Sequence, residues 1–249
     1  MDEDTILGSD EADTELDLDD LEGANYAIRL DNVSRIYDLD GHEIQAVQDV
    51  TMEVTPGEFV AISGPSGSGK TTLLNIIGCI DCVSSGRVYV MDVPIGDYDE
   101  AFRATFRLTY TGFIFQSYNL ISTLTALENV MFPMQLSERK LSTIRSEASN
   151  LLKRVGLSER EDHLPWQMSS GEQQRVAIAR AMANDPPVIL ADEPTANLDA
   201  ESATMVRDLL TALNHEGKTV VTMTHDHRLL SLPDARRYEM KNGALRPHE

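Results

Sequence analysis

A glycine-rich segment, residues 64–71, constrains the fold of this chain more than any other feature of the sequence. It reads Gly-Pro-Ser-Gly-Ser-Gly-Lys-Thr and matches the pattern G-x-x-x-x-G-K-[S/T]. An apolar run at residues 59–62 precedes it, and a helical pattern over residues 70–77 follows. A strand, a glycine-rich loop and a helix in this order are typical of loops that bind phosphate groups. The sequence therefore predicts an α/β protein with a nucleotide site at this loop.

Each residue type in the loop suits the binding of phosphates. Glycines allow the backbone to curl so that successive N–H groups point at phosphate oxygens, and the following helix adds the positive end of its dipole. We expect the Lys70 ammonium to reach the β- and γ-phosphates and the Thr71 hydroxyl to bind Mg²⁺. A turn without function is the alternative, which the flanking strand and helix disfavour. The candidate nucleotide-binding residues of the loop are Gly64, Pro65, Ser66, Gly67, Ser68, Gly69, Lys70, Thr71 and Thr72.

Two carboxylates follow a second apolar run, residues 188–191. These are Asp192 and Glu193. A carboxylate at the C-terminal end of such a strand faces the crevice where nucleotides bind in α/β sheets. Asp192 suits Mg²⁺, directly or through water, and Glu193 is placed to polarise an attacking water. A solvated strand end is the alternative. Together with the glycine-rich loop, the pair predicts hydrolysis of the bound nucleotide.

The order of the remaining patterns predicts one α/β domain with an insertion. Residues 28–33 and 44–54 alternate as strands of an antiparallel layer, and the α/β pattern resumes after residue 170. Between them, residues 117–170 change character: Thr125 and Glu128 have the spacing of a capping box, and residues 141–155 are helical in pattern. We expect a single domain over residues 25–249, with a helical subdomain inserted at about 117–170.

The charge of the chain is uneven. Its formal net charge is −20, and residues 1–24 hold eleven acidic side chains and no basic one. Because such a segment buries too little apolar surface to order itself, we expect a disordered acidic tail over residues 1–24. The negative field disfavours nucleic acid as a partner. We also expect no membrane-spanning helix and no secretory signal, because long apolar runs and a basic start are both lacking.

Residues 168–175 read Met-Ser-Ser-Gly-Glu-Gln-Gln-Arg, and at this point the sequence resembles the ATP-binding-cassette (ABC) ATPases. The segment is similar to their signature, Leu-Ser-Gly-Gly-Glu/Gln, at the start of a helix. Other motifs follow the order of the family: an aromatic residue 27 positions ahead of the loop, the Q-loop glutamine, the D-loop and the switch histidine. In this chain they are Tyr37, Gln116, Ala196-Asn197-Leu198-Asp199 and His225. Tyr26 is the alternative for the aromatic residue, and the spacing favours Tyr37. The resemblance covers about residues 26–247.

The resemblance implies a P-loop NTPase (RecA-like) core with an antiparallel β layer and a helical signature subdomain. It also implies that two copies pair head to tail with two ATP molecules between them, each ATP touching one copy's loop and the other copy's signature helix. ATP and Mg²⁺ are then the ligands, and the catalytic residues are Glu193 and His225. The further ligand contacts that it implies come from Tyr37, Gln116, Ser169, Gly171, Glu172 and Asp199, with Thr71, Gln116 and Asp192 at the metal.

The resemblance also assigns a role to each of these residues. Tyr37 would stack on adenine, and Gln116 would join the Mg²⁺ shell. His225 would hold the γ-phosphate and the attacking water in line, and Asp199 would act across the dimer seam. Two positions depart from the pattern. Met168 replaces the signature leucine, a mild apolar exchange. Ser170 stands where the family usually has the first signature glycine, so its Cβ is expected to affect efficiency rather than identity.

Residues 112–134 resemble the macrolide-export and lipoprotein-release branch of the family, as do residues 185–187 and 193–197. This resemblance implies an ATPase subunit that powers a separate membrane permease and exports lipids, lipoproteins or hydrophobic compounds. It would lie at the cytoplasmic face of the cell membrane, held there by the permease. The expected apolar floor for a coupling helix of the permease is Tyr118, Asn119, Leu120 and Phe132.

Two other classes remain open. One is an ABC ATPase that regulates a membrane complex without a transported substrate, as in cell-division relatives of this branch. The other is a machine of DNA repair or translation. Repair members carry coiled-coil or zinc insertions and translation members carry two cassettes, and neither feature is present in this sequence. The transported substrate is not encoded here, because permeases choose substrates.

Overall fold

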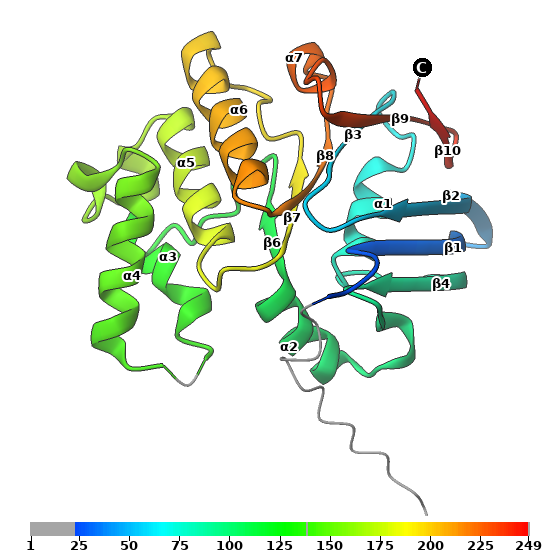
Figure 1. Cartoon of the computed structure of the whole chain (residues 1–249), viewed down its shortest axis with the longest axis horizontal. Helices are drawn as coiled ribbons and strands as arrows, with labels where there is room; N and C mark the ends of the chain where they lie inside the picture. The colour runs from blue at the N-terminus through cyan, green and yellow to red at the C-terminus, as the bar shows by residue number, and fades with distance from the viewer. Residues whose placement is uncertain (1–22, 138, 249) are drawn as a thin grey trace, which may run out of the picture.

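The computed structural model describes residues 23–137 and 139–248. The acidic tail predicted over residues 1–24 lies almost entirely outside the described residues. Two sheets and a group of helices form the described part (Figure 1). None of the described helices is long and apolar enough to cross a membrane.

The larger sheet has six strands in the order β10-β9-β3-β8-β7-β6. Neighbours are parallel except for β9 and β10. Every residue of β7 and β8 is buried, as expected of parallel strands covered on both faces. The bounds are β3 Phe59–Ser63, β6 Thr111–Ile114, β7 Val188–Asp192, β8 Thr219–Met223, β9 Ala235–Lys241 and β10 Ala244–Pro247.

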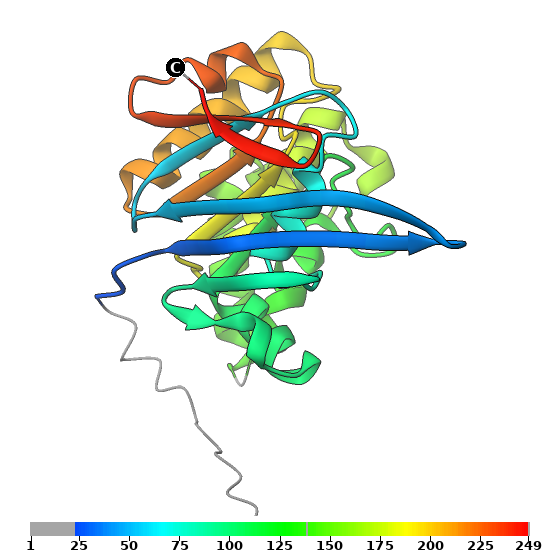
Figure 2. The ribbon, with the colours of Figure 1, turned by 90° about the vertical axis from the view of Figure 1, so that its right-hand side faces the viewer.

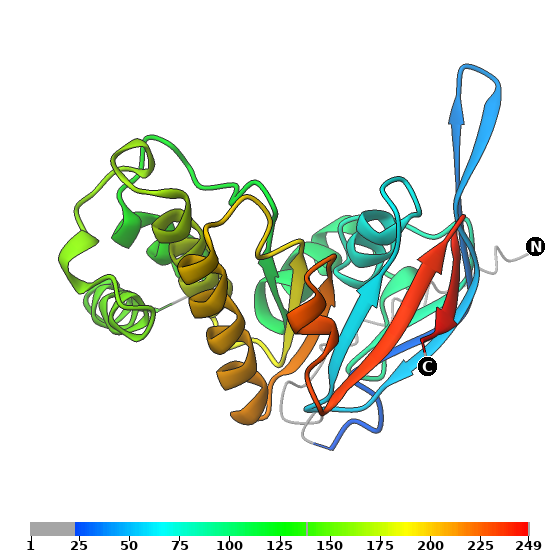
Figure 3. The same ribbon diagram turned by 90° about the horizontal axis from the view of Figure 1, so that it is seen from above.

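The smaller sheet has four strands in the order β2-β1-β4-β5 and is antiparallel throughout. Its strands are β1 Ile28–Leu39, β2 His42–Val54, β4 Ser85–Val90 and β5 Val93–Pro94. The antiparallel layer expected from the alternating pattern is therefore present. Figures 2 and 3 show the turn end of the β1–β2 hairpin projecting beyond the other strands.

Helix α1 (Lys70–Ile77) lies between the two sheets. Its buried side chains, which include Leu73 and Ile76, join one hydrophobic cluster with residues of both sheets. Helix α2 (Glu100–Tyr110) precedes β6, and α6 (Ala200–His215) and the short α7 (His227–Leu230) flank β8 in the chain. The glycine-rich loop thus leads from a central strand into a helix held by both layers.

Helices α3 (Ala126–Met134), α4 (Leu141–Arg154) and α5 (Ser170–Ala181) gather on the side of β6 away from the smaller sheet (Figure 1). The Thr125–Glu128 capping box is present at the start of α3, and both reciprocal hydrogen bonds are made. Three 3₁₀ turns complete the described helical elements: η2 (Ile95–Asp97), η3 (Ser158–Arg160) and η4 (Pro165–Gln167).

Candidate active site

The glycine-rich loop wraps around the side chain of Lys70. Lys70 Nζ donates hydrogen bonds to the carbonyl oxygens of Gly64, at 2.6 Å, and Pro65, at 3.1 Å. Gly69 precedes α1 with a φ of 104°, and a Cβ at this position would lie 2.0 Å from the Ala46 carbonyl oxygen of β2. Only glycine fits this close approach at positive φ. The loop therefore places a buried ammonium beside the N-terminus of α1, a suitable environment for an anion.

The carboxylate that ends β7 meets the first turn of α1. Thr71 Oγ1 donates a hydrogen bond to Asp192 Oδ2 at 2.8 Å, although the two residues are 121 positions apart. Hydroxyl and carboxylate oxygens are ligands that Mg²⁺ prefers, so this pair fits that ion. Within residues 23–137 and 139–248, no group of three or more His, Cys, Asp or Glu could hold a metal ion. Mg²⁺ is commonly held by one or two protein oxygens together with phosphate oxygens and water, and the Thr71–Asp192 pair fits that pattern.

Glu193 is held in an uncommon backbone conformation. Its φ is 46°, and its N–H donates to the Met223 carbonyl of β8 at 2.8 Å. The side chain accepts a hydrogen bond from the His225 N–H at 3.1 Å, and Oε1 lies 3.3 Å from His225 Nε2. Non-glycine residues persist in the left-handed region when their surroundings over-determine them, often at functional sites. The local strain here aims the carboxylate at the loop after β8.

One cavity of about 730 Å³ brings most of the predicted site residues together. It includes the loop from Ser66 to Thr72, the two carboxylates after β7, Gln116 and His225. Gly64 and Pro65 lie at the start of the same loop. The full lining is Ile44, Gln45, Ala46, Ser66, Gly67, Ser68, Gly69, Lys70, Thr71, Thr72, Gln116, Asp192, Glu193, Thr195, Ala196, His225 and Asp226.

Sequence reasoning missed several lining residues. Ile44, Gln45 and Ala46 come from β2 in the other sheet, and Ile44 is 48% exposed, which is unusual for a large apolar side chain. Asp226 pairs with Arg207 at 2.8 Å. Burial opposes the charge on Asp226, but hydrogen bonds from the Arg228 backbone and the Arg207 side chain hold its pKa below the ordinary value. The sequence pattern of β2 carried no signal for its lining residues, because their place at the cavity depends on how the two sheets pack.

The signature residues begin α5 and lie outside this cavity. Ser169 is the N-cap, and its hydroxyl and Glu172 form a reciprocal capping box. Arg160 bonds Glu172 at 2.8 Å, and this bond, followed by the Ser169 N–H, lowers the pKa of Glu172 to about 2. A Cβ at Gly171 would come within 2.2 Å of Ser202 Oγ in α6. Helix packing therefore requires a glycine at this position.

Ser202 links Asp199 to the signature residues, because it faces Gly171 and also hydrogen-bonds Asp199. Asp199 is the N-cap of α6, and its carboxylate accepts hydrogen bonds from the Glu201 and Ser202 backbones. Ser202 Oγ also donates to Asp199 Oδ2 at 2.7 Å. The N-termini of α5 and α6 thus form a second cluster of predicted residues, apart from the cavity.

Tyr37 is not among the residues that line the cavity. It lies on β1 directly opposite Ile44 of β2, which does line it. The Tyr37 hydroxyl donates to Asp81, and the Arg35 guanidinium lies 4.5 Å from the ring centroid. The ring is therefore held beside the wall of the cavity.

A second, largely apolar cavity of about 650 Å³ opens between β6, α2 and α3. Phe132 and Leu136 contribute to its lining and are 44% and 63% exposed. Of the four residues predicted as an apolar floor, Asn119 and Phe132 line it, whereas Leu120 packs against the core. The Tyr118 and Asn119 carbonyls accept hydrogen bonds from Arg180, which fixes the chain after Gln116.

Comparisons with known proteins show to which family the chain is similar. A family model described as "ABC transporter" matches residues 47–196. The lipoprotein-releasing system ATP-binding protein LolD of Bordetella pertussis is 41% identical over 222 residues, which cover 89% of this chain and 96% of that protein. The macrolide export ATP-binding/permease protein MacB of Hyphomonas neptunium is 42% identical over 218 residues, which cover 88% of this chain and 34% of that protein.

A solved structure matches the fold. It is a dimeric post-hydrolysis state of the ATP-binding cassette MJ0796 of Methanocaldococcus jannaschii, bound to ADP and Pi. It superposes with a TM-score of 0.84 at 42% sequence identity, covering 89% of this chain and 97% of that chain.

Proposed function

The chain belongs to the ABC transporter family as an ATP-binding, ATP-hydrolysing subunit, and from this premise we propose that it powers a separate membrane permease through ATP-driven pairing of two copies. One observation carries the proposal most directly. A single cavity joins the phosphate-binding loop, the Asp192–Glu193 pair and His225, which are the groups that binding and hydrolysis of a nucleoside triphosphate require.

The binding step uses the loop and the carboxylate beside it. Loop N–H groups, the α1 dipole and the Lys70 ammonium attract the β- and γ-phosphates. Thr71, Asp192 and Gln116 are the residues that would hold Mg²⁺, and their oxygens suit it. When bound, Mg²⁺ neutralises negative charge on the phosphates.

The hydrolysis step uses Glu193 as the general base. Its carboxylate would take a proton from the water that attacks the γ-phosphate. His225, whose ring lies 3.3 Å from Glu193 and is 57% exposed, would turn its ring to donate a hydrogen bond to the γ-phosphate. Tyr37 would stack on adenine beside Ile44.

The signature residues favour a role between two copies. Ser169, Gly171 and Glu172 start α5 outside the cavity of their own chain, so they would contact ATP only in a second copy placed head to tail. The N-terminus of α5 suits a γ-phosphate for the same reason as the loop does. The MJ0796 structure is of a dimer, which supports this arrangement. Asp199 would then lie at the seam.

The apolar cavity beside Phe132 is the proposed seat for a helix of the permease. Exposed apolar side chains around a groove are typical of protein interaction sites. The groove adjoins the segment that starts at Gln116, so a helix docked there would sense the nucleotide site. The chain would then lie at the cytoplasmic face of the membrane, bound through the permease. Residues 25–249 would form one ATPase domain, with the helical subdomain at about 117–170.

The relatives named for lipoprotein release and macrolide export support export of lipids, lipoproteins or hydrophobic compounds. Affinity isolation of the Glu193→Gln variant from its native membranes, with ATP, tests this proposal. A co-purifying multi-span permease with a transport pathway would support it. A division or envelope-remodelling complex would favour the regulatory alternative instead.

The matched control is Glu193→Gln combined with Phe132→Asp. It should keep ATP binding but lose the membrane partner, because a carboxylate in an apolar groove is costly to bury. Retention of the same partner by both variants would exclude this groove as the docking site.

A further inference from the structure

The segment that follows α1, residues 78–82, carries a side chain with no role in the proposed mechanism. This side chain is that of Asp81, which lies near the end of the segment, between α1 and β4, and is 20% exposed. The opposite end of α1 begins at Lys70 in the phosphate-binding loop. A single two-turn helix therefore separates Asp81 from the groups that would bind phosphates.

Both carboxylate oxygens of Asp81 are engaged by strand β1. Oδ2 accepts the hydrogen bond of the Tyr37 hydroxyl, and Oδ1 accepts from Arg35 Nη2 at 2.8 Å. Arg35 and Tyr37 are two positions apart on one strand, so both side chains lie on the same face. Because the guanidinium lies 4.5 Å from the Tyr37 ring centroid, it covers one face of the ring. Asp81 thus holds both the Tyr37 ring and the Arg35 guanidinium that packs on that ring.

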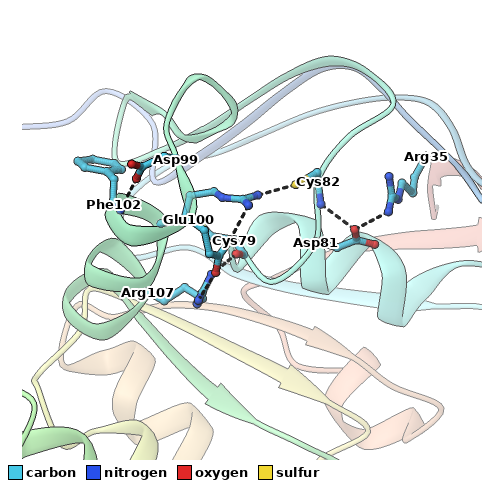
Figure 4. Close-up of polar contacts among 9 residues, drawn as sticks. Arg35, Cys79, Asp81, Cys82, Asp99, Glu100, Phe102 and Arg107 are labelled. Atoms are coloured by element: carbon cyan, nitrogen blue, oxygen red, sulfur yellow. Dashed lines mark hydrogen bonds and ion pairs between the residues drawn. The ribbon is translucent and has the colours of Figure 1, made fainter. Parts of the chain in front are cut away.

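The segment itself is held firmly from the other side. Arg103 donates to Cys82 Sγ and Arg107 donates to the Cys79 carbonyl, each at 2.5 Å. Glu100 forms ion pairs with both arginines. Figure 4 shows these contacts from α2 on one side of the segment and Arg35 reaching Asp81 on the other. The carboxylate therefore has a fixed position from which to hold Tyr37.

The register of the smaller sheet places the ring beside the nucleotide cavity. Tyr37 pairs with Ile44, and Ile44 lines the cavity together with the phosphate-binding loop. Directly opposite residues on antiparallel strands point to the same face and lie close together. Because Arg35 covers one face of the ring, a flat partner would stack on the opposite face.

We propose that Asp81 is a positioning residue for the adenine base, which it serves by holding the Tyr37 ring in the orientation that stacks on the base. This inference rests on the proposed function, in which Tyr37 contacts adenine. Asp81 touches neither base nor phosphate. Its loss should therefore weaken the binding of adenine nucleotides and leave the binding of phosphates alone unchanged.

The test compares two ligands on the full chain by calorimetry: ADP, and pyrophosphate as a ligand without base or sugar. Tyr37→Ala removes the ring and should weaken ADP binding by about five- to 100-fold. Asp81→Ala and Tyr37→Phe each break the hydrogen bond and should weaken it by about three- to tenfold. Pyrophosphate binding should stay within about twofold in every variant.

Two further readouts separate positioning from a general structural effect. Asp81→Ala should raise KM for ATP and leave kcat nearly unchanged, because only base binding is lost. Combining Asp81→Ala with Tyr37→Phe should weaken ADP binding by less than the product of the single effects, since both break one bond. Asp97→Ala, an exposed carboxylate in η2, is the matched control and should bind ADP normally.

The outcomes distinguish a failure of the proposed adenine contact from a failure of the positioning role of Asp81. If Tyr37→Ala binds ADP normally, the adenine contact of the proposed function is wrong and the role of Asp81 falls with it. If Tyr37→Ala is weakened but Asp81→Ala and Tyr37→Phe are not, only the positioning role is overturned. An equal loss of pyrophosphate and ADP binding would also overturn it. Tyr37→Phe, which breaks the same hydrogen bond, carries the test if Asp81→Ala fails to fold.

Discussion

The Glu193 carboxylate contacts both the backbone N–H and the ring of His225. The carboxylate accepts a hydrogen bond from the His225 N–H at 3.1 Å and lies 3.3 Å from Nε2 of the same residue. The two residues follow neighbouring parallel strands, β7 and β8, so the sheet itself sets their separation. The proposed general base and the proposed phosphate-binding group are thereby placed together, although they lie 32 positions apart in the sequence.

Glu193→Gln should therefore remove hydrolysis without disturbing the site. The amide oxygen can still accept from the His225 N–H, but it cannot take a proton from water. We expect turnover to fall by about 100-fold or more, with ATP affinity nearly unchanged. Phosphate release and nucleotide binding measured on the same preparation check this. Hydrolysis at a near-normal rate would remove Glu193 as the base.

The Thr71–Asp192 pair predicts a metal-specific defect. Asp192→Asn keeps the shape and an acceptor for the Thr71 hydroxyl but removes the negative charge. We expect the Mg²⁺ concentration for half-maximal ATPase activity to rise by at least about tenfold. Thr71→Ser keeps the hydroxyl and is the matched control, which should titrate like the wild type. An unchanged Mg²⁺ titration of Asp192→Asn would exclude this carboxylate from the metal site.

The contact between α5 and α6 predicts a rescue. Gly171→Ala would place a methyl group 2.2 Å from Ser202 Oγ and 2.7 Å from Ser202 Cβ, so the free energy of unfolding should drop by about 1–3 kcal/mol. Ser202→Gly removes both atoms. Gly171→Ala should therefore lower the free energy of unfolding by less in the Ser202→Gly background than in the wild type. Chemical denaturation of the four proteins measures the cycle. Strict additivity would show that the two positions are not coupled.

The capping carboxylate of α5 predicts a pH dependence. In the folded chain the pKa of Glu172 is about 2, against an ordinary value of 4.5. A lowered pKa means that the ionised group stabilises the fold above pH 4.5, and that this stabilisation fades as the pH falls towards 2. At pH 7 the free energy of unfolding of the wild type should exceed that of Glu172→Gln by about 1 kcal/mol. This difference is small because the Arg160–Glu172 pair is partly exposed.

Urea unfolding of both proteins between pH 7 and pH 3 tests this dependence. Their difference should shrink steadily below pH 4.5, whereas Glu159→Gln, an exposed change in η3, should show no such trend. A difference that stays constant to pH 3 would contradict the lowered pKa.

Much of the core could be predicted from the sequence, because its strands are unbroken apolar runs. The helix predicted over residues 70–77 has those bounds in the structure. Helix α5 starts at Ser170 because Ser169 provides the cap. Strand β9 was not predicted, since only Ala235 and Met240 are buried in it and its pattern is mostly polar.

Helix α2 was also missed, although its pattern carries a signal. Phe102, Phe106 and Tyr110 recur at a spacing of four, and neighbouring rings in this series stack with centroids 6.1 and 4.5 Å apart. That period is typical of one face of a helix. Only Phe106 and Tyr110 are buried, so the apolar stripe is narrow.

The cavity followed from the sequence only in part. Groups after β3, β6, β7 and β8 had to meet, because the carboxyl ends of parallel strands share one edge of a sheet. The contribution of Ile44 depends on how the second sheet packs against the first. Register shifts between β1 and β2 near Arg35 also decide which residues face the cavity. Neither property is local in sequence, so the pattern of β2 did not reveal it.

The mass of the Glu193→Gln variant in solution reports whether two copies pair head to tail around ATP. Light scattering after size-exclusion chromatography should give a monomer without nucleotide and a dimer with ATP and Mg²⁺. Glu193→Gln combined with Ser169→Arg, which obstructs the N-terminus of α5, should bind ATP and remain monomeric. A Glu193→Gln protein that is saturated with ATP yet stays monomeric at micromolar concentration would contradict the head-to-tail pairing of two copies around ATP.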